Sequence, residues 1–121
     1  MTDAPRNPRR QRERWGRRAE TVAAWWLRLK GYRVLARRVR TPLGEIDLVV
    51  ARGRTLVLIE VKARATLALA HESLSAASRR RLRRAGALVA AQWPGTWLKY
   101  RFDVVLVAPR HFPRHLVGVE L

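Results

Sequence analysis

Two apolar runs separated by three residues constrain the fold of this chain more than any other feature. Residues 45–51 and 55–63 are rich in aliphatic and β-branched side chains, and only Arg52-Gly53-Arg54 lies between them. Runs of this length with so short a connection predict two antiparallel strands. A two-residue Gly53-Arg54 loop would form a type II′ turn, because that turn takes glycine at its first central position.

The same loop fixes how the two predicted strands face each other. Counted back from it, Asp47 faces Glu60 and Glu45 faces Lys62. Side chains two residues apart on a strand share one face of the sheet. All four charged side chains are therefore predicted on one face.

These acids are unusual in a chain with nine Asp and Glu against twenty-six Lys and Arg. Like charges that face each other destabilise a sheet. A divalent cation between Asp47 and Glu60 would remove the repulsion, and the alternative is that one carboxyl group stays protonated. The pattern predicts a Mg²⁺ or Mn²⁺ site for cutting a phosphodiester, with Asp47, Glu60 and the Val61 carbonyl as ligands. Lys62 would hold or activate the attacking water and neutralise charge on the phosphate.

A second interpretation of these acids is a hairpin edge in contact with solvent, where ordinary Glu–Arg pairs need no metal. The short Glu60-Val61-Lys62 pattern also arises by chance. However, the flanking residues Leu48-Val49-Val50 and 56–59 are too apolar for a solvated edge. We therefore favour the metal site.

The segment before the first strand has the periodicity of an amphipathic helix over residues 15–30. Its apolar positions are Trp15, Ala19, Val22, Ala23, Trp26 and Leu29. Gly31 is predicted to end the helix at the C′ position, where glycine tolerates a left-handed backbone. Residues 1–14 are rich in arginine and proline and lack this periodicity, so they are predicted to be a disordered basic arm.

A second helix is predicted over residues 72–91, with an apolar side and a basic side. The basic side, here called the arginine face, consists of Arg79, Arg80, Arg81, Arg83 and Arg84. Because no acid lies within helical reach of it, contact with phosphate is favoured over a merely solvated surface. Arg17 and Arg64 complete the set of predicted nucleic-acid contacts.

The remaining strands complete a mixed sheet. Residues 32–39 and 100–108 are predicted strands, and residues 116–121 a short peripheral one. Short connections make the first three strands an antiparallel meander, and the helical crossover makes the strand at 100–108 parallel to the one at 55–63. The predicted fold is one α/β sandwich over residues 15–121, with a helix on each face of the sheet.

The formal net charge of +17 indicates a polyanionic partner, because such a field concentrates nucleic acid at the surface. Anionic membrane is the other polyanion, but no segment approaches the ~18 consecutive apolar residues of a membrane span, and no signal-peptide pattern is present. The absence of cysteine excludes a disulfide framework and a thiolate zinc site. These features predict a cytoplasmic protein whose partner is DNA rather than a membrane.

Other residues of interest have simpler predicted roles. Asp103 lies inside an apolar strand, where a structural hydrogen bond is favoured over catalysis. His71, His111 and His115 have no metal-ligand spacing and are expected on the surface. The five tryptophans are expected in the core rather than as a platform for base stacking, except Trp25, which lies off the apolar stripe.

The order of helix, strand, GEIDLV, hairpin, LIEVKAR, helix and RFDVV resembles the YraN-like family of bacterial proteins over roughly residues 14–108. That family belongs with the restriction-endonuclease-like, PD-(D/E)xK nucleases and is similar to Holliday-junction resolvases. The resemblance implies the restriction-endonuclease-like αβββαβ fold. It also implies Asp47 and Glu60 as metal ligands and Lys62 as the catalytic lysine. Glu20 would correspond to the helical glutamate that completes the site.

One stretch departs from the family pattern. Family members often carry Lys-Gln near the start of the second helix, where this chain has Ser78-Arg79. An arginine there would take over contact with phosphate. The prediction is a Mg²⁺- or Mn²⁺-dependent, endonuclease-like protein that binds and cleaves branched or structured DNA, and the alternative is a non-catalytic nucleic-acid-binding module with the same fold. The sequence leaves open whether the protein forms a homodimer.

Overall fold

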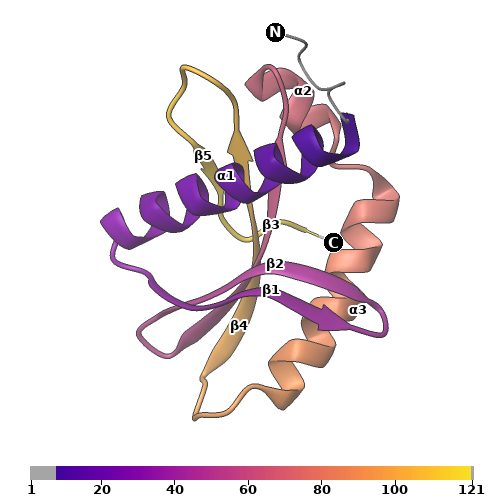
Figure 1. The fold of residues 1–121 in the computed structure, drawn as a ribbon. Helices are drawn as coiled ribbons and strands as arrows, with labels where there is room; N and C mark the ends of the chain where they lie inside the picture. The colour runs from indigo at the N-terminus through magenta and orange to yellow at the C-terminus, as the bar shows by residue number, and fades with distance from the viewer. Residues whose placement is uncertain (1–7, 121) are drawn as a thin grey trace, which may run out of the picture.

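Five strands form one open sheet with helices on both of its faces (Figure 1). This computed structural model describes the backbone of residues 8–120 and the side chains of residues 14–120. In chain order the elements are α1 (Pro8–Leu29), β1 (Arg33–Thr41), β2 (Gly44–Arg52), β3 (Thr55–Ala63), α2 (Leu67–Glu72), α3 (Ala76–Gln92), β4 (Lys99–Val107) and β5 (Arg114–Leu116). The strands lie in the order β1-β2-β3-β4-β5. The predicted mixed α/β arrangement with a helix on each face is confirmed.

The β2–β3 hairpin has the predicted turn and register. Pairing starts at Arg52 and Thr55 and continues to Leu48 and Ile59. Gly53 has a φ of +57° and the residue after it has a negative φ, as a type II′ turn requires. β1 pairs antiparallel with β2, β4 pairs parallel with β3, and β5 pairs antiparallel with β4. The predicted meander and parallel crossover are therefore confirmed.

The sheet separates two apolar clusters. Leu48 and Ile59 pack with α1 on one face, and Val49 and Leu58 pack with α3 on the other. This is the alternation expected of neighbouring residues on a strand. Each of these fully buried side chains contributes about 1.5–3 kcal/mol relative to exposure to water. The sheet is thus fixed between the two helices, and its strand ends are positioned for the site.

α1 buries only part of the predicted apolar stripe, which included Ala19 and Ala23. The apolar side chains that it buries are those of Ala19, Ala23, Ala24 and Leu27. Val22 and Leu29, which the periodicity placed on the buried stripe, are exposed. Short alanine side chains let the helix backbone approach the sheet closely, so the bulkier side chains remain outside. The predicted stripe is therefore wrong at these two positions.

The two ends of α1 differ in how well the sequence predicted them. The helix begins at Pro8, so residues 8–14 are helical and the predicted disordered arm is wrong over this range. Proline is tolerated in a first turn, and arginine and glutamine favour helix. Residues 1–7 lie outside the described residues. At the other end Gly31 has a φ of +92° and the Tyr32 N–H closes the last turn, as predicted.

The helix predicted over residues 72–91 corresponds to α3, which begins later, at Ala76, and the short separate helix α2 before it was not predicted. Thr66 caps α2 and Ser75 caps α3, and each side chain accepts a backbone N–H three residues later at 3.1 Å. Such caps start separate helices. The last strand also differs, since β5 spans Arg114–Leu116 rather than 116–121.

A buried polar network joins β5 to β4. Asp103 is fully buried and accepts hydrogen bonds from Arg101, His115 and the Gly118 amide. Burial would raise the pKa of this carboxyl group, but these hydrogen bonds outweigh burial and lower it to about 2. The predicted structural role of Asp103 is confirmed. The surface position expected for His115 is wrong, because its side chain is buried and its Nδ1 lies 2.6 Å from Lys30 Nζ.

Candidate functional site

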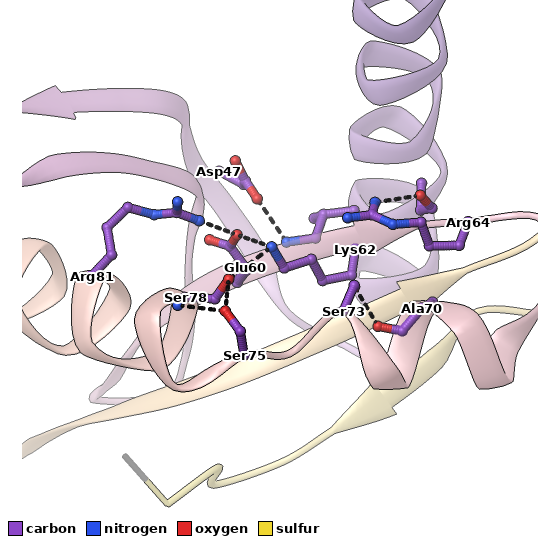
Figure 2. Close-up of polar contacts among 11 residues, drawn as sticks. Asp47, Glu60, Lys62, Arg64, Ala70, Ser73, Ser75, Ser78 and Arg81 are labelled. Carbon is purple, nitrogen blue, oxygen red and sulfur yellow. Dashed lines mark hydrogen bonds and ion pairs between the residues drawn. The ribbon is translucent and has the colours of Figure 1, made fainter.

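The pairing between β2 and β3 stops at Leu48 and Ile59, and Asp47 occupies the opening beyond it. Hydrogen-bonded pairs alternate along an antiparallel ladder, so the Val61 N–H would next donate to a β2 carbonyl. It donates instead to Asp47 Oδ2 at 2.7 Å (Figure 2). The carboxylate of Asp47 therefore stands between the two strands where they separate.

Glu60 and Lys62 project from β3 toward α3. Glu60 Oε1 lies 2.8 Å from Arg81 Nη2 and 3.2 Å from Lys62 Nζ. Lys62 Nζ also donates to Ser78 Oγ at 3.2 Å, and Figure 2 shows these groups converging between β3 and α3. Both side chains are largely buried. Two cations thus compensate one buried carboxylate, and Lys62 is held in one orientation by two partners.

Glu20 approaches this region from α1, on the other face of the sheet. Its Oε1 lies 3.0 Å from Arg38 Nε, but this ion pair is not directed as a hydrogen bond, and the buried oxygen has no hydrogen-bond partner. Burial raises the pKa of Glu20, although Arg38 opposes the shift. Sequence reasoning missed Arg38 as a partner of Glu20. Arg38 has a φ of +52° and lies across from Asp47, between regular β1–β2 pairs.

One pocket of about 680 Å³ brings the predicted acids together. Glu20 from α1, Asp47 from β2 and Glu60 from β3 all line it, with Val61 and Arg64. Burial and the nearby Glu60 charge raise the pKa of Asp47 to about 7, although the Val61 N–H opposes the shift. The pocket therefore contains negative charge that its own surroundings do not fully neutralise.

The arrangement of faces differs from the predicted one. Ile46 packs with α3, whereas Leu48, two residues later, packs with α1. Strict alternation therefore breaks at Asp47, because its side chain takes over a backbone hydrogen bond of the ladder. Asp47 and Glu60 are consequently not partners in the ladder, and the prediction of one shared face is wrong for β2. Glu45 instead forms an ion pair with Arg40 on the neighbouring strand β1, with 3.6 Å between Glu45 Oε2 and Arg40 Nε.

The chemistry of the pocket fits a hard divalent cation. Such ions bind carboxylate oxygens, and Glu20 Oε1 is a buried oxygen whose one close partner is the ion pair with Arg38. A bound cation would also favour the charged form of Asp47. As the side chains stand, no three acidic or histidine side chains among residues 14–120 enclose a metal position. Glu60 would have to turn from Arg81 toward the pocket to join Glu20 and Asp47.

The arginines of the arginine face differ in their surroundings. Arg81 is half exposed and its guanidinium is paired with Glu60, so the argument that no acid is available to this face is wrong for Arg81. Arg80 and Arg84 are exposed. Ser78 is buried and accepts from Lys62, which gives a physical reason for a small hydroxyl residue where the family pattern has lysine.

The turn between β1 and β2 packs against Arg81. Gly44 has a φ of +138°, and a Cβ atom there would lie 2.7 Å from Arg81 Cγ. That separation is shorter than contacts between carbon atoms allow. The absence of a side chain at Gly44 therefore gives the aliphatic part of Arg81 its path to Glu60.

These features define a class of small α/β proteins whose open mixed sheet carries a carboxylate pocket where two strands separate. None of the helices in the described part of the chain has the length and apolar character to span a membrane.

The chain belongs to the family described as Uncharacterised protein family UPF0102, whose model matches residues 19–107. A UPF0102 protein of Parvibaculum lavamentivorans is 57% identical over 104 residues, which cover 85% of this chain and 78% of the relative. One of Sphingopyxis alaskensis is 47% identical over 104 residues, covering 86% and 90%. One of Caulobacter vibrioides is 49% identical over 102 residues, covering 84% and 82%. The membership predicted from the YraN-like resemblance is confirmed.

Proposed function

We propose that this protein is a divalent-metal-dependent, endonuclease-like protein that acts on DNA and has the restriction-endonuclease-like fold. The observation that carries the proposal is a single pocket lined by Glu20, Asp47 and Glu60 from three different elements. The order of α1, β1 to β3, α3 and β4 follows the αβββαβ order of the nucleases that the sequence resembles, and α2 and β5 are additions to it. Membership of UPF0102 itself names no activity.

Each site residue has a role that its surroundings support. Mg²⁺ or Mn²⁺, when bound, would polarise the phosphate and acidify a bound water. Glu20, Asp47, Glu60 and the Val61 carbonyl would hold the ion. Lys62 would orient the attacking water and neutralise charge that develops on the phosphate. Its hydrogen bond to Ser78 restricts the ammonium group to this position.

The proposed substrate is DNA because the chain carries a net charge of +17. Arg17, Arg64 and the exposed part of the arginine face would hold the phosphate backbone. Arg64 lines the acidic pocket, so it lies close enough to hold the strand that is cut. A homodimer and a location in the cytoplasm remain predictions from the sequence.

A second candidate is a non-catalytic DNA-binding module that keeps this fold. The observation that favours it is the double pairing of Glu60 with Arg81 and Lys62, which neutralises this carboxylate without a metal. In that case the three charged groups would be a structural network. The two candidates differ in whether an ion stabilises the folded protein.

Thermal melting with and without Mn²⁺ tests the proposal. A ligand that binds only the folded state at about 100 times its Kd adds about 2.7 kcal/mol of stability, so the wild-type Tm is expected to rise by several degrees. Asp47→Ala should remove most of this gain, and calorimetry should show the matching loss of Mn²⁺ binding. Lys62→Ala should keep the gain yet lose DNA cleavage. A wild-type protein that gains no stability from the ion would favour the non-catalytic module.

A further inference from the structure

The outer side of α1 carries large apolar side chains that the fold leaves in solvent. Val22, Trp25 and Leu29 recur at helical spacing on the side opposite the buried alanines. Trp25 is 60% exposed and Leu29 is 77% exposed. An exposed apolar cluster of this kind marks an interaction surface, because isolated surface apolar residues are usually scattered.

The loop between β4 and β5, yellow in Figure 1, carries Phe112, which contacts Trp26 of α1. Phe112 is 81% exposed and stacks on Trp26, with ring centroids 5.5 Å apart and 27° between the planes. Pro109 and Pro113 restrict the loop on both sides of Phe112. The ring is thus held outward in a fixed position rather than on a freely moving tip.

One of these rings carries an arginine, and further arginines are exposed on the same helix and loop. The guanidinium carbon of Arg28 lies 5.4 Å from the centre of the Trp25 ring. Arg18 on the same helix and Arg110 on the loop are exposed. Among residues 14–29 of α1 the one acid is Glu20, which is buried on the other side of the helix. We call this region the outer α1 surface: Arg18, Val22, Trp25, Trp26, Arg28, Leu29, Arg110 and Phe112.

Two partners have chemistry that fits apolar rings with a cationic rim, namely a second copy of the chain and a nucleic acid with unpaired bases. A second copy would bring together two molecules of charge +17 through rims of the same sign, which opposes association. Unpaired bases stack on aromatic rings while their phosphates pair with arginine, so both features of the surface would be used. Charge therefore favours nucleic acid.

We propose that the outer α1 surface binds unpaired DNA bases, with Trp25 and Phe112 as the stacking rings. The inference rests on the proposed function for the choice of DNA and adds the substrate class, a single-stranded segment next to a duplex. Glu20 precedes Trp25 by five residues, which is about 8 Å along the helix axis. Because Glu20 lies on the other side of α1, a strand that stacks on this surface has to pass around the helix to reach the acidic pocket.

The test compares the affinities of the full chain for a labelled single strand and for a blunt duplex of the same sequence, by fluorescence anisotropy. Trp25→Ala and Phe112→Ala are each expected to weaken binding of the single strand about 5- to 100-fold and binding of the duplex less than about twofold. Trp25→Phe keeps a stacking ring and should retain most of the affinity. A matched control is Tyr100→Ala, which removes an exposed aromatic ring on the α3 side of the sheet and should change neither affinity.

The other outcomes overturn the inference in distinguishable ways. Unchanged single-strand binding in both alanine variants overturns the stacking surface, and persistent duplex binding would then leave the proposed function in place. Equal losses on both DNA forms would mean a general effect on charge or folding and would also overturn it. A wild-type dimer that Trp25→Ala dissociates in sedimentation, without a change in affinity, would assign the surface to a second copy. Failure of the wild type to bind either DNA form would refute the proposed function itself.

Discussion

Asp47 and Glu60 line one pocket but have opposite electrostatic surroundings. Glu60 Oε1 has two cationic groups within 3.2 Å. Asp47 accepts one backbone N–H, and burial together with neighbouring acids raises its pKa to about 7. The attraction for an external cation is therefore concentrated at Asp47, while Glu60 is neutralised by the protein's own side chains.

Replacement of Asp47 by asparagine should stabilise the metal-free protein at high pH. An acid whose pKa rises from 3.8 to about 7 on folding binds protons more tightly in the folded state, so its contribution to stability falls as pH rises through this range. Asp47→Asn keeps an acceptor for the Val61 N–H. It should raise the free energy of unfolding by on the order of 2 kcal/mol at pH 8 and change it little at pH 4.

Urea melts at the two pH values, in the presence of a chelator, measure this difference. Glu72→Gln is the matched control, because it removes an acid from an exposed position on α2. It should shift stability by less than about 0.5 kcal/mol at both pH values. Equal behaviour of Asp47→Asn at pH 4 and pH 8 would contradict the raised pKa.

Arg81 competes with a metal ion for Glu60. Its guanidinium lies 2.8 Å from Oε1, so an ion that uses this carboxylate has to displace it. Arg81→Ala is therefore expected to tighten Mn²⁺ binding severalfold in calorimetry, and Arg80→Ala, which alters the next residue on an exposed part of α3, should leave it unchanged. Weaker Mn²⁺ binding in Arg81→Ala would mean that Arg81 organises the site instead.

At the scale of single elements, local rules predicted the hairpin but not the place where it opens. A two-residue loop leaves one register, so the pairs from Arg52–Thr55 to Leu48–Ile59 followed from the sequence. The alternation rule then failed at Asp47, because a side chain replaced a backbone acceptor of the ladder. That exchange depends on three-dimensional proximity, which a strand pattern does not encode.

The helices show a similar limit. Periodicity identified α1 and two of its buried residues, Ala19 and Ala23, but it also placed the larger Val22 and Leu29 on the buried stripe. Packing on the sheet selected the alanine side, because a close approach buries more of the sheet than bulky side chains would allow. For α2 and α3, the capping residues Thr66 and Ser75 were visible in the sequence as the signal that separates them.

β5 depends on one buried carboxylate, and Asp103→Asn should release it. The folded pKa of Asp103 is lowered to about 2 from 3.8, so its contribution is present above pH 4 and is lost as pH falls toward 2. The shift corresponds to about 2 kcal/mol, and loss of the charge beside half-buried Arg101 should cost about 3 kcal/mol at pH 7.

Hydrogen exchange locates this effect, and urea melts measure its size. In Asp103→Asn the amides of residues 114–118 should lose protection first, while the amides of the β2–β3 hairpin keep theirs. A variant with wild-type protection in β5 would show that Asp103 does not hold this strand.

At the scale of the whole molecule, the net charge of +17 should make DNA binding steeply dependent on salt. Each neutralised phosphate contributes about −0.9 to the slope of log K against log salt concentration. Reversal of Arg79, Arg80 and Arg84 to glutamate should reduce the size of that slope by about 2–3 if this part of the arginine face contacts the backbone.

A control for this prediction reverses three exposed arginines near the β2–β3 turn, away from α3. They are Arg33, Arg52 and Arg54. The change in net charge is the same, so a site-specific contact predicts a smaller change in slope for the control. Equal slopes in the two variants would mean that DNA is held by the overall field and not by α3.

The composition of the candidate site was partly predictable at this scale. Asp47, Glu60 and Lys62 were visible because acids and lysine are rare in this chain and lie within apolar strands. Arg38 and Arg81 were not, since each reaches its acid from an element distant in sequence and each is one of twenty-three arginines. In so basic a chain, an arginine that pairs with a particular acid has no distinguishing local signal.

The contact between Gly44 and Arg81 has a consequence for protein engineering. Replacing a turn glycine is a common way to stabilise a loop, because it reduces the freedom of the unfolded chain. At Gly44 the positive φ already opposes such a change, and any new side chain would meet the stem of Arg81. A library of substitutions at this turn would therefore select for the position of Arg81 as much as for turn stability. Variants chosen from it would also have a changed pairing between Arg81 and Glu60.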